Sequence, residues 1–103
     1  MNNIVDDEGF LVDFNSWNEE IAKKMAESQF TIQLKEKHWA CIGIVREYYK
    51  KWGSMPMVKT IRDEEKVTVE EFDDLFRRET SSARGVLCKI SGLPRLLCIA
   101  AGC

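Results

Sequence analysis

The sequence predicts a mainly α-helical fold, a small orthogonal bundle of about five helices that includes a helix-turn-helix-like unit. Apolar residues recur every three or four positions over most of the chain, capping patterns begin several of these stretches, and glycine or proline ends others. The chain has 103 residues, of which 45% are hydrophobic and 31% charged, as in ordinary globular domains. We therefore expect one domain over residues 1–103.

The beginning of the chain predicts a short extended or β element ahead of the first helix. In "DDEGFLVD" a turn at Glu8-Gly9 precedes a run of alternating apolar positions. These positions are Phe10, Val12 and Phe14. The alternation favours a short strand or an extended lead-in.

The first helix is expected in "NSWNEEIAKKMAES". Ser16 and Glu19 form a capping-box pattern, in which the two side chains bond reciprocally to the first turn of a helix. Apolar residues follow at a spacing of four: Trp17, Ile21 and Met25. The following "QFTIQL" is interpreted as a connector.

The longest helix is predicted over residues 35–52, with a short helix after it in "PMVKTIRDE". Gly53 is a suitable stop for the first, and Ser54 is expected to cap the second with Pro56 in its first turn. Together they form the helix-turn-helix outline. The expected apolar stripe of the long helix is Trp39, Ile42, Val45, Tyr49 and Trp52.

Two more helices are expected before the chain ends. Thr68 and Glu71 form a capping box ahead of "TVEEFDDLFRRE", and Gly92 stops the helix in "SSARGVLCKISG". Residues 92–103 show no helix cap, so we expect a mobile, cysteine-bearing arm. The expected buried residues of the two helices are Phe72, Leu75, Phe76, Ala83, Val86, Leu87 and Ile90.

Hydropathy and charge exclude a membrane-spanning protein and a protein with a secretory signal. No apolar run approaches the roughly 20 residues of a membrane-spanning helix. The N-terminus is acidic where a secretory signal would be basic and then apolar. We expect a cytoplasmic protein with no membrane partner, whose cysteines are thiols or reactive groups rather than structural disulfides.

Charge is unevenly distributed along the chain. Residues 1–34 and 63–80 each carry a net charge of −5, whereas residues 35–62 carry +5. A basic segment with a helix-turn-helix outline suits a DNA-binding regulator, which could be redox-sensitive. It also suits helix faces in solvent whose charges pair within the molecule. The second helix of the outline offers few polar side chains for reading bases, so DNA binding is the alternative hypothesis.

Three cysteines fall within the last sixteen residues: Cys88, Cys98 and Cys103. The thiolate is the reactive form of cysteine, and the nearby Lys89 and Arg95 favour it. A thiol on a mobile arm can enter a partner's active site, and a second thiol can resolve the adduct as a disulfide. This pattern indicates redox or sulfur-transfer chemistry.

The sequence indicates neither a metal nor a cofactor. Cys-x9-Cys-x4-Cys with the single His38 does not match the paired ligand spacing of zinc sites, and Cys41 is expected to be a buried small hydrophobe. His38 beside Trp39 is interpreted as structural. The chain shows no Ser/His/Asp arrangement and no glycine-rich phosphate loop, so a stand-alone enzyme is not predicted.

Three stretches in order resemble the DsrC/TusE family of sulfur-relay proteins. "DDEGFLVDFNSW" is similar to the family's "D-x-x-G-F-L-x-D-x-x-x-W", and "HWACIGIVREYYKKWGSMPMVKTI" to its "H-W-x-x-I-x-x-x-R-x-Y-Y…P-x-x-[RK]", which ends on Lys59. "CKISGLPR" resembles its "C-[KR]-I-A-G-L-P-K". The chain departs from the pattern in a shorter arm and in continuing past Ile99 to Cys103.

The resemblance implies a helical sulfur carrier with an N-terminal hairpin. A C-terminal cysteine would accept sulfur, as a persulfide or trisulfide, and deliver it to a partner enzyme. Cys98 is favoured by its sequence context, with Cys88 or Cys103 as the resolving thiol, and Cys103 stays open as the delivering one. Arg95 and Lys59 would assist the thiolate or the docking of partners. Cys88 favours the sulfite-reductase branch over tRNA 2-thiouridine synthesis, so the expected partners are sulfur donors and acceptors of sulfite reductase or sulfurtransferase type.

Overall fold

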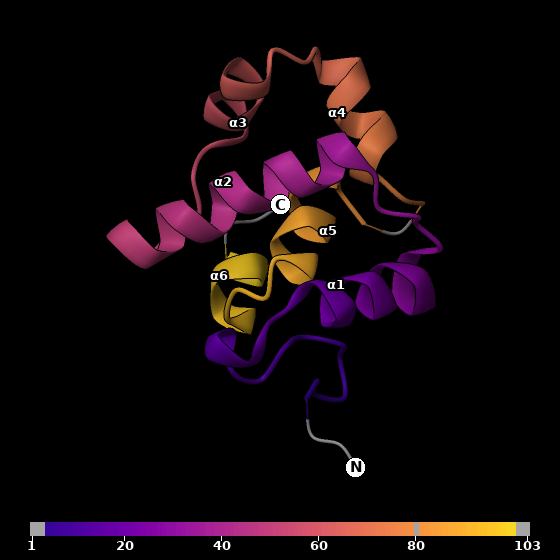
Figure 1. Cartoon of the computed structure of the whole chain (residues 1–103), viewed down its shortest axis with the longest axis vertical. Helices are drawn as coiled ribbons and strands as arrows, with labels where there is room; N and C mark the ends of the chain where they lie inside the picture. The colour runs from indigo at the N-terminus through magenta and orange to yellow at the C-terminus, as the bar shows by residue number, and fades with distance from the viewer. Residues whose placement is uncertain (1–3, 80, 101–103) are drawn as a thin grey trace.

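The computed structural model describes residues 4–79 and 81–100, and over these ranges the protein is almost wholly helical (Figure 1). The five expected helices are present. A sixth, α6, lies in the segment expected to be a helix-free arm, so that part of the prediction is wrong; the mobility of residues 92–103 stays a prediction. The helices are α1 (Glu19–Met25), α2 (Glu36–Trp52), α3 (Val58–Glu65), α4 (Val69–Phe76), α5 (Ala83–Ile90) and α6 (Arg95–Ala100).

Helix α2 runs across the molecule in the view of Figure 1. Figure 1 shows α3 and α4 on one side of it and α1, α5 and α6 on the other, with α5 at the centre. Helix α5 contacts α2, α4 and α6, so the main core forms around it. The largest fully buried side chains include Ile42, Val45, Ile61, Phe76, Val86, Leu87, Ile90 and Leu93.

The N-terminal segment is extended, as expected, but it is a bridge and not a regular strand. Val5 and Leu11 form an isolated antiparallel bridge around a turn in which Gly9 has a φ of 89°. Leu11 is 3% exposed and Val12 63%, so Val12 does not belong to the buried face that the alternation predicted. The face changes because the chain turns into a 3-10 helix, Phe14–Ser16, and strand periodicity ends there.

Helix α1 begins later than the capping pattern predicted. Its N-cap is Asn18, whose side chain accepts a hydrogen bond from Ile21 N, whereas Ser16 belongs to the preceding 3-10 turn. An asparagine is as good an N-cap as a serine, so the local signal did not distinguish the two. The helix then continues as a π-helical turn, Ala26–Phe30, which includes the first two residues of the expected connector.

Helix α2 matches its predicted bounds, and Gly53 ends it with a φ of 72°. Its stripe is narrower than expected, because Trp52 is 66% exposed at the free end of the helix. The next helix starts at Val58 and its N-cap is Met57. Contrary to the prediction, Ser54 is therefore not the N-cap, and Pro56 is not in the first turn. Pro56 is instead fully buried within the turn, which is longer than predicted because α3 begins at Val58.

The contact between α2 and α4 is organised by His38, which is structural as expected. Its Nδ1 accepts from Lys35 N and its Nε2 donates to Leu75 O, at 2.9 Å each. Its ring meets Phe76 edge to face. The predicted capping box of Thr68 and Glu71 is present at the start of α4.

Candidate functional site

Two of the predicted cysteines are joined in a disulfide. Cys88 in the last turn of α5 bonds to Cys98 in α6, with Cα atoms 5.7 Å apart and a sequence separation of ten. This Cα separation is ordinary for a disulfide. Cys88 has no exposed surface, whereas Cys98 is 7% exposed. The structure thus pairs Cys98 with Cys88, one of the two resolving cysteines left open above, while Cys103 lies outside the described residues.

A tight reversal between α5 and α6 makes this pairing possible. Gly92 adopts a left-handed φ of 81°, with its N–H bonded to Lys89 O, and Leu93 N donates to Cys88 O. This is a Schellman-type helix end. Leu93 is fully buried, so it anchors the turn ahead of Pro94, whose carbonyl accepts hydrogen bonds from Leu97 N and Cys98 N of α6. The Gly-Leu-Pro sequence therefore places Cys98 beside Cys88.

The reversal is fixed from outside by two side chains distant in sequence. Trp17 donates from its indole nitrogen to Ile90 O at 2.9 Å, and Arg46 donates to Ser91 O at 2.8 Å. Both carbonyls belong to the end of α5, where a helix has no internal donors for them. A Cβ on Gly92 would stand 2.8 Å from Trp17 and 3.3 Å from Arg46. Close packing and the left-handed φ together explain the glycine.

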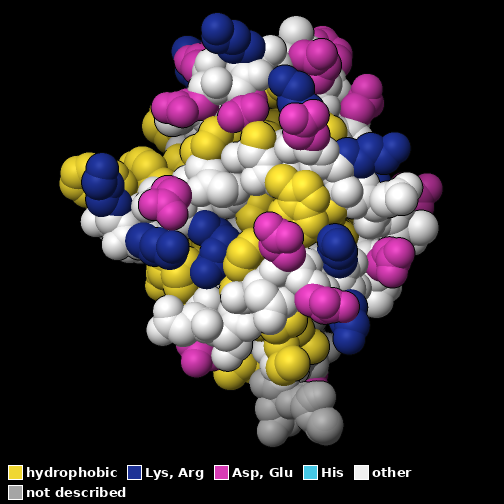
Figure 2. Space-filling model, in the orientation of Figure 1, with side chains coloured by type: hydrophobic (Ala, Val, Ile, Leu, Met, Phe, Trp, Pro, Cys, Tyr) yellow, Lys and Arg dark blue, Asp and Glu magenta, His cyan; other side chains and the backbone are white. Residues whose placement is uncertain are grey.

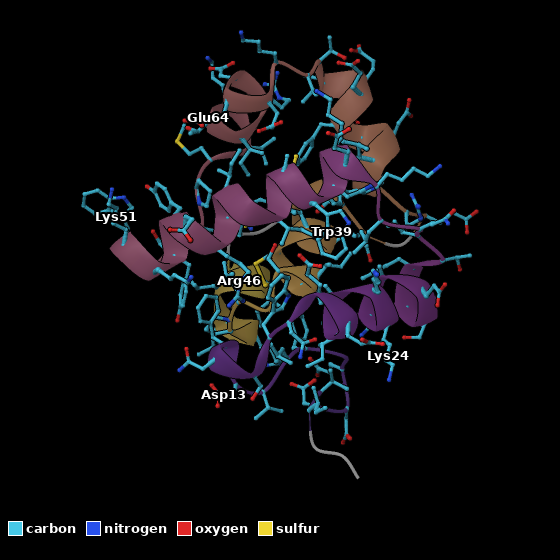
Figure 3. All side chains as sticks on the ribbon, in the orientation of Figure 1. Asp13, Lys24, Trp39, Arg46, Lys51 and Glu64 are labelled. Carbon is cyan, nitrogen blue, oxygen red and sulfur yellow. A yellow bond between two sulfur atoms is a disulfide. The ribbon has the colours of Figure 1, made fainter. Side chains whose placement is uncertain are left out.

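Arg46 is held between two aromatic rings. Its guanidinium carbon lies 3.8 Å from the centroid of Phe14 and 4.2 Å from that of Trp17. Figure 3 shows this side chain extending from α2 towards α6 and the N-terminal turn. Burial lowers the pKa of Arg46 from its ordinary value. The tryptophan and arginine of the two quoted motifs thus serve one purpose, which is to hold the junction that carries the cysteines.

A small cavity adjoins Cys98, and Cys88 is not among the residues that line it. It has a volume of about 260 Å³, and Cys98 lies in its wall with Lys89, Ser81, Ser82, Phe10 and Phe30. The Lys89 ammonium is 4.6 Å from the Phe10 centroid and 5.6 Å from the Phe30 centroid. Burial lowers the pKa of Lys89, against a smaller opposing effect of Asp6 and Glu8. From the sequence, Lys89 was identified only as a neighbour of Cys88, because a cavity lined by residues as distant as Phe10 and Phe30 leaves no local signal.

The two predicted assisting residues lie in different places. Arg95, the first residue of α6, pairs with the carboxylate of Glu8, with Nε and Oε1 2.5 Å apart. Lys59 pairs with Asp63 within α3, on the other side of α2 from α6 in Figure 1. Arg95 therefore connects α6 to the turn at Glu8-Gly9. Lys59 is not part of the disulfide region. Their assisting roles stay predictions.

The remaining candidates are accounted for by burial and spacing. Cys41 has no exposed surface, and burial raises the pKa of its thiol to about 11, which suits the predicted role as a small hydrophobe. Within the described ranges, no group of three or more His, Cys, Asp or Glu side chains is placed to hold a metal ion. Over the same residues, no helix is long and apolar enough to cross a membrane.

The helix-turn-helix outline is present as α2, the turn after Gly53, and α3. On the face in Figure 2, acidic and basic side chains are interspersed, so the +5 charge of residues 35–62 does not form a separate basic surface there. The α3 residue Lys59 is neutralised by Asp63. No comparison with known proteins supports DNA binding.

Comparisons with known proteins agree with the site geometry. The gamma subunit of dissimilatory-type sulfite reductase from Nitratidesulfovibrio vulgaris is 32% identical over 91 residues, which are 88% of this chain and 84% of the relative. Sulfurtransferase TusE from Pectobacterium atrosepticum is 29% identical over 97 residues, 87% of this chain and 85% of the relative. The crystal structure of the oxidised gamma subunit of dissimilatory sulfite reductase (DsrC) from Archaeoglobus fulgidus superposes with a TM-score of 0.75 at 29% identity, covering 87% of this chain and 85% of that one.

The match extends over almost the whole chain. The sequence profile of the family described as "DsrC like protein" matches residues 2–99, which include both disulfide cysteines, the Gly-Leu-Pro turn, Trp17 and Arg46. This protein belongs to the DsrC/TusE family of sulfur-relay proteins.

Proposed function

We propose that this protein is a sulfur carrier in which Cys98 accepts the sulfur and Cys88 resolves the adduct. The observation that carries the proposal is the Cys88–Cys98 pair, held ten residues apart on two helices by one tight turn. Cys98 is the more exposed of the two, and its helix is the last described element. An acceptor thiol must be reached by a partner, so Cys98 takes this role and Cys88 the resolving one.

The chemistry balances without a cofactor. In the reduced protein, the Cys98 thiolate attacks the outer sulfur of a donor persulfide, which forms a Cys98 persulfide and releases the donor thiolate. A partner can take that outer sulfur and return the Cys98 thiolate. Alternatively, the Cys88 thiolate attacks the inner sulfur of Cys98, which releases hydrosulfide and forms the disulfide seen here. A dithiol reductant then restores the two thiols.

The two-cysteine arrangement favours the sulfite-reductase branch over tRNA thiolation. A resolving cysteine allows the protein to donate two electrons as it forms its disulfide, as a reductive partner requires. A relay that only hands on a sulfur atom needs a single thiol. The similarity to a dissimilatory-type sulfite reductase gamma subunit supports this branch, and the partners proposed are an enzyme of that class and a sulfur donor.

Mass spectrometry of the reduced protein after incubation with glutathione persulfide tests the proposal. We expect one added sulfur on the peptide that contains Cys98, followed by disulfide formation and hydrosulfide release. Cys98→Ser should abolish loading, whereas Cys88→Ser should accumulate the persulfide because the resolving thiol is gone.

Two further variants complete the design. Cys103→Ser should load as the wild type does, and Cys41→Ala is the matched control for loss of a buried cysteine outside the pair. Added sulfur that remains on Cys103 in the Cys98→Ser variant would assign delivery to Cys103 and overturn the role of Cys98.

A further inference from the structure

The cavity beside Cys98 combines three features that the carrier chemistry described above does not use. It is concave, it contains a cationic side chain, and its wall includes one of the two disulfide-bonded residues, Cys98. The volume of about 260 Å³ exceeds the share of a single water, about 30 Å³, and is below the roughly 300–1,000 Å³ of drug-sized ligand sites. A small polyatomic anion is the class of ligand that fits such a space.

The charge of the cavity comes from Lys89. Within the ranges that the structure describes, no carboxylate lies within ion-pair distance of its ammonium, which instead faces the rings of Phe10 and Phe30. The nearest acidic influences are Asp6 and the carboxylate of Glu8, and Glu8 is held by Arg95. A partly buried ammonium without a close counter-ion attracts an anion more strongly than an exposed one does, because water screens it less. The hydroxyl-bearing Ser81 and Ser82 add polar groups to the same wall.

The geometry points to a subsite in which Lys89 binds a small sulfur anion, hydrosulfide or sulfite, and directs it to Cys98 of the disulfide. This inference rests on the disulfide state of the proposed function and adds a second, small-molecule route by which Cys98 receives sulfur. Cys98 is in the cavity wall, whereas Cys88 is fully buried and is not. Of the two disulfide-bonded residues, a nucleophile in the cavity is therefore next to Cys98 and not Cys88.

The reaction is a displacement at sulfur that needs no other oxidant. The anion contributes the electron pair of the new bond to Cys98 Sγ, the disulfide bond breaks, and its electron pair leaves with Cys88. With hydrosulfide the product is a Cys98 persulfide, and the proton of hydrosulfide passes to the departing Cys88 sulfur. With sulfite the product is a Cys98 S-sulfonate, and Cys88 takes its proton from water.

Sulfite and hydrosulfide are the probes for the oxidised full-length protein. We expect the rate of disulfide opening to saturate with sulfite concentration, and mass spectrometry to find the sulfonate on the Cys98 peptide. Hydrosulfide should leave one added sulfur on the same peptide. Lys89→Gln should lower the sulfite rate about tenfold at subsaturating concentration, the effect of losing one charge-assisted contact. Lys89→Arg should retain most of it.

Two controls separate anion binding from a loosened structure. Lys23→Gln removes an equal charge from an exposed position on α1 and should leave the rate unchanged. An uncharged phosphine reductant should open the disulfide of the wild type and of Lys89→Gln equally fast. An equal loss with sulfite and phosphine, a rate linear in sulfite, or an adduct on Cys88 would overturn the subsite.

The subsite and the carrier function fail in different experiments. Loading of the reduced protein by glutathione persulfide does not use the disulfide. If that loading succeeds while the sulfite rate is indifferent to Lys89, the inference is wrong and the proposed function stands. If that loading fails on Cys98, the carrier proposal is wrong whatever sulfite does.

Discussion

The two sides of α2 hold their cysteines in different ways. On one side, Cys41 is enclosed in the core and burial raises the pKa of its thiol to about 11. On the other, Cys98 lies on a six-residue helix whose outward residues Leu96 and Ile99 are 69% and 47% exposed. Both sulfurs are nearly or fully buried. Both belong to the same apolar cluster, but Cys41 lies within the long helix α2, whereas Cys98 lies on a short helix attached through one turn, one disulfide and one ion pair.

This comparison shows that burial by itself does not identify an inert cysteine. Cys98 is buried because α6 packs on α5, and a helix of this length has little intrinsic stability. We expect release of α6 to expose Cys98 at a lower cost in free energy than exposure of Cys41, which lies within the 17-residue helix α2. The distinction is one of local stability.

The largest loss in free energy of unfolding is expected from a substitution between α2 and α4. Phe76→Ala removes a fully buried ring that contacts His38 and Phe72, and should lower the free energy of unfolding by about 3–5 kcal/mol. Leu96→Ala on α6 should change it by less than about 0.5 kcal/mol, because that side chain is 69% exposed. Denaturant titration measures both. Equal losses would show that α6 belongs to the same cooperative core.

Reduction of the Cys88–Cys98 disulfide should lower the local stability of α6 but not that of the middle of α2. A bond that closes a loop of about this length contributes about 2–3 kcal/mol, so its loss should accelerate amide hydrogen exchange in α6 by a corresponding factor. Exchange in the middle of α2 around Ile42 should change far less. Hydrogen exchange of oxidised and reduced protein, read by mass spectrometry, measures this. Equal acceleration in both segments would contradict a separately anchored α6.

Gly92→Ala would weaken the turn itself. The substitution places a Cβ 2.8 Å from both Leu11 and Trp17 in a left-handed conformation, and should cost about 1–3 kcal/mol. It should also slow reformation of the Cys88–Cys98 disulfide after reduction. Gly43→Ala is the matched control, because a Cβ there has nothing within 4 Å. Disulfide reformation at the wild-type rate in Gly92→Ala would show that the turn does not position the cysteines.

The smallest effect is expected from the pH dependence of His38. Burial lowers its pKa below the ordinary value of 6.5, so the unfolded chain binds the proton more readily than the folded protein. Stability is thus fully present above about pH 6.5 and decreases as pH falls from there towards the lowered pKa of the folded state. His38→Gln should flatten this part of the stability profile, measured by denaturant titration at several pH values. A decrease unchanged in the variant would assign it to other groups.

Local patterns predicted the helices well but their ends less well. The bounds of α2, the capping box of α4 and the buried face of α5 follow from apolar spacing and caps, which neighbouring residues decide. Helix α6 was missed, because six residues form a helix only when packed against something. The exposure of Trp52 was missed for a related reason: apolar periodicity does not reveal that α2 extends beyond its neighbours.

The sequence by itself determined the helical class, the positions of most helices, and, through the order of its motifs, the family and the cysteines to examine. Only the tertiary structure decided that Cys98 pairs with Cys88, that Trp17 and Arg46 bond the carbonyls at the end of α5, and that Lys89 shares a cavity with Cys98. The division has a physical reason. Helix signals lie within a few residues of one another, whereas a site is made by contacts between segments up to 87 residues apart, such as that of Glu8 with Arg95.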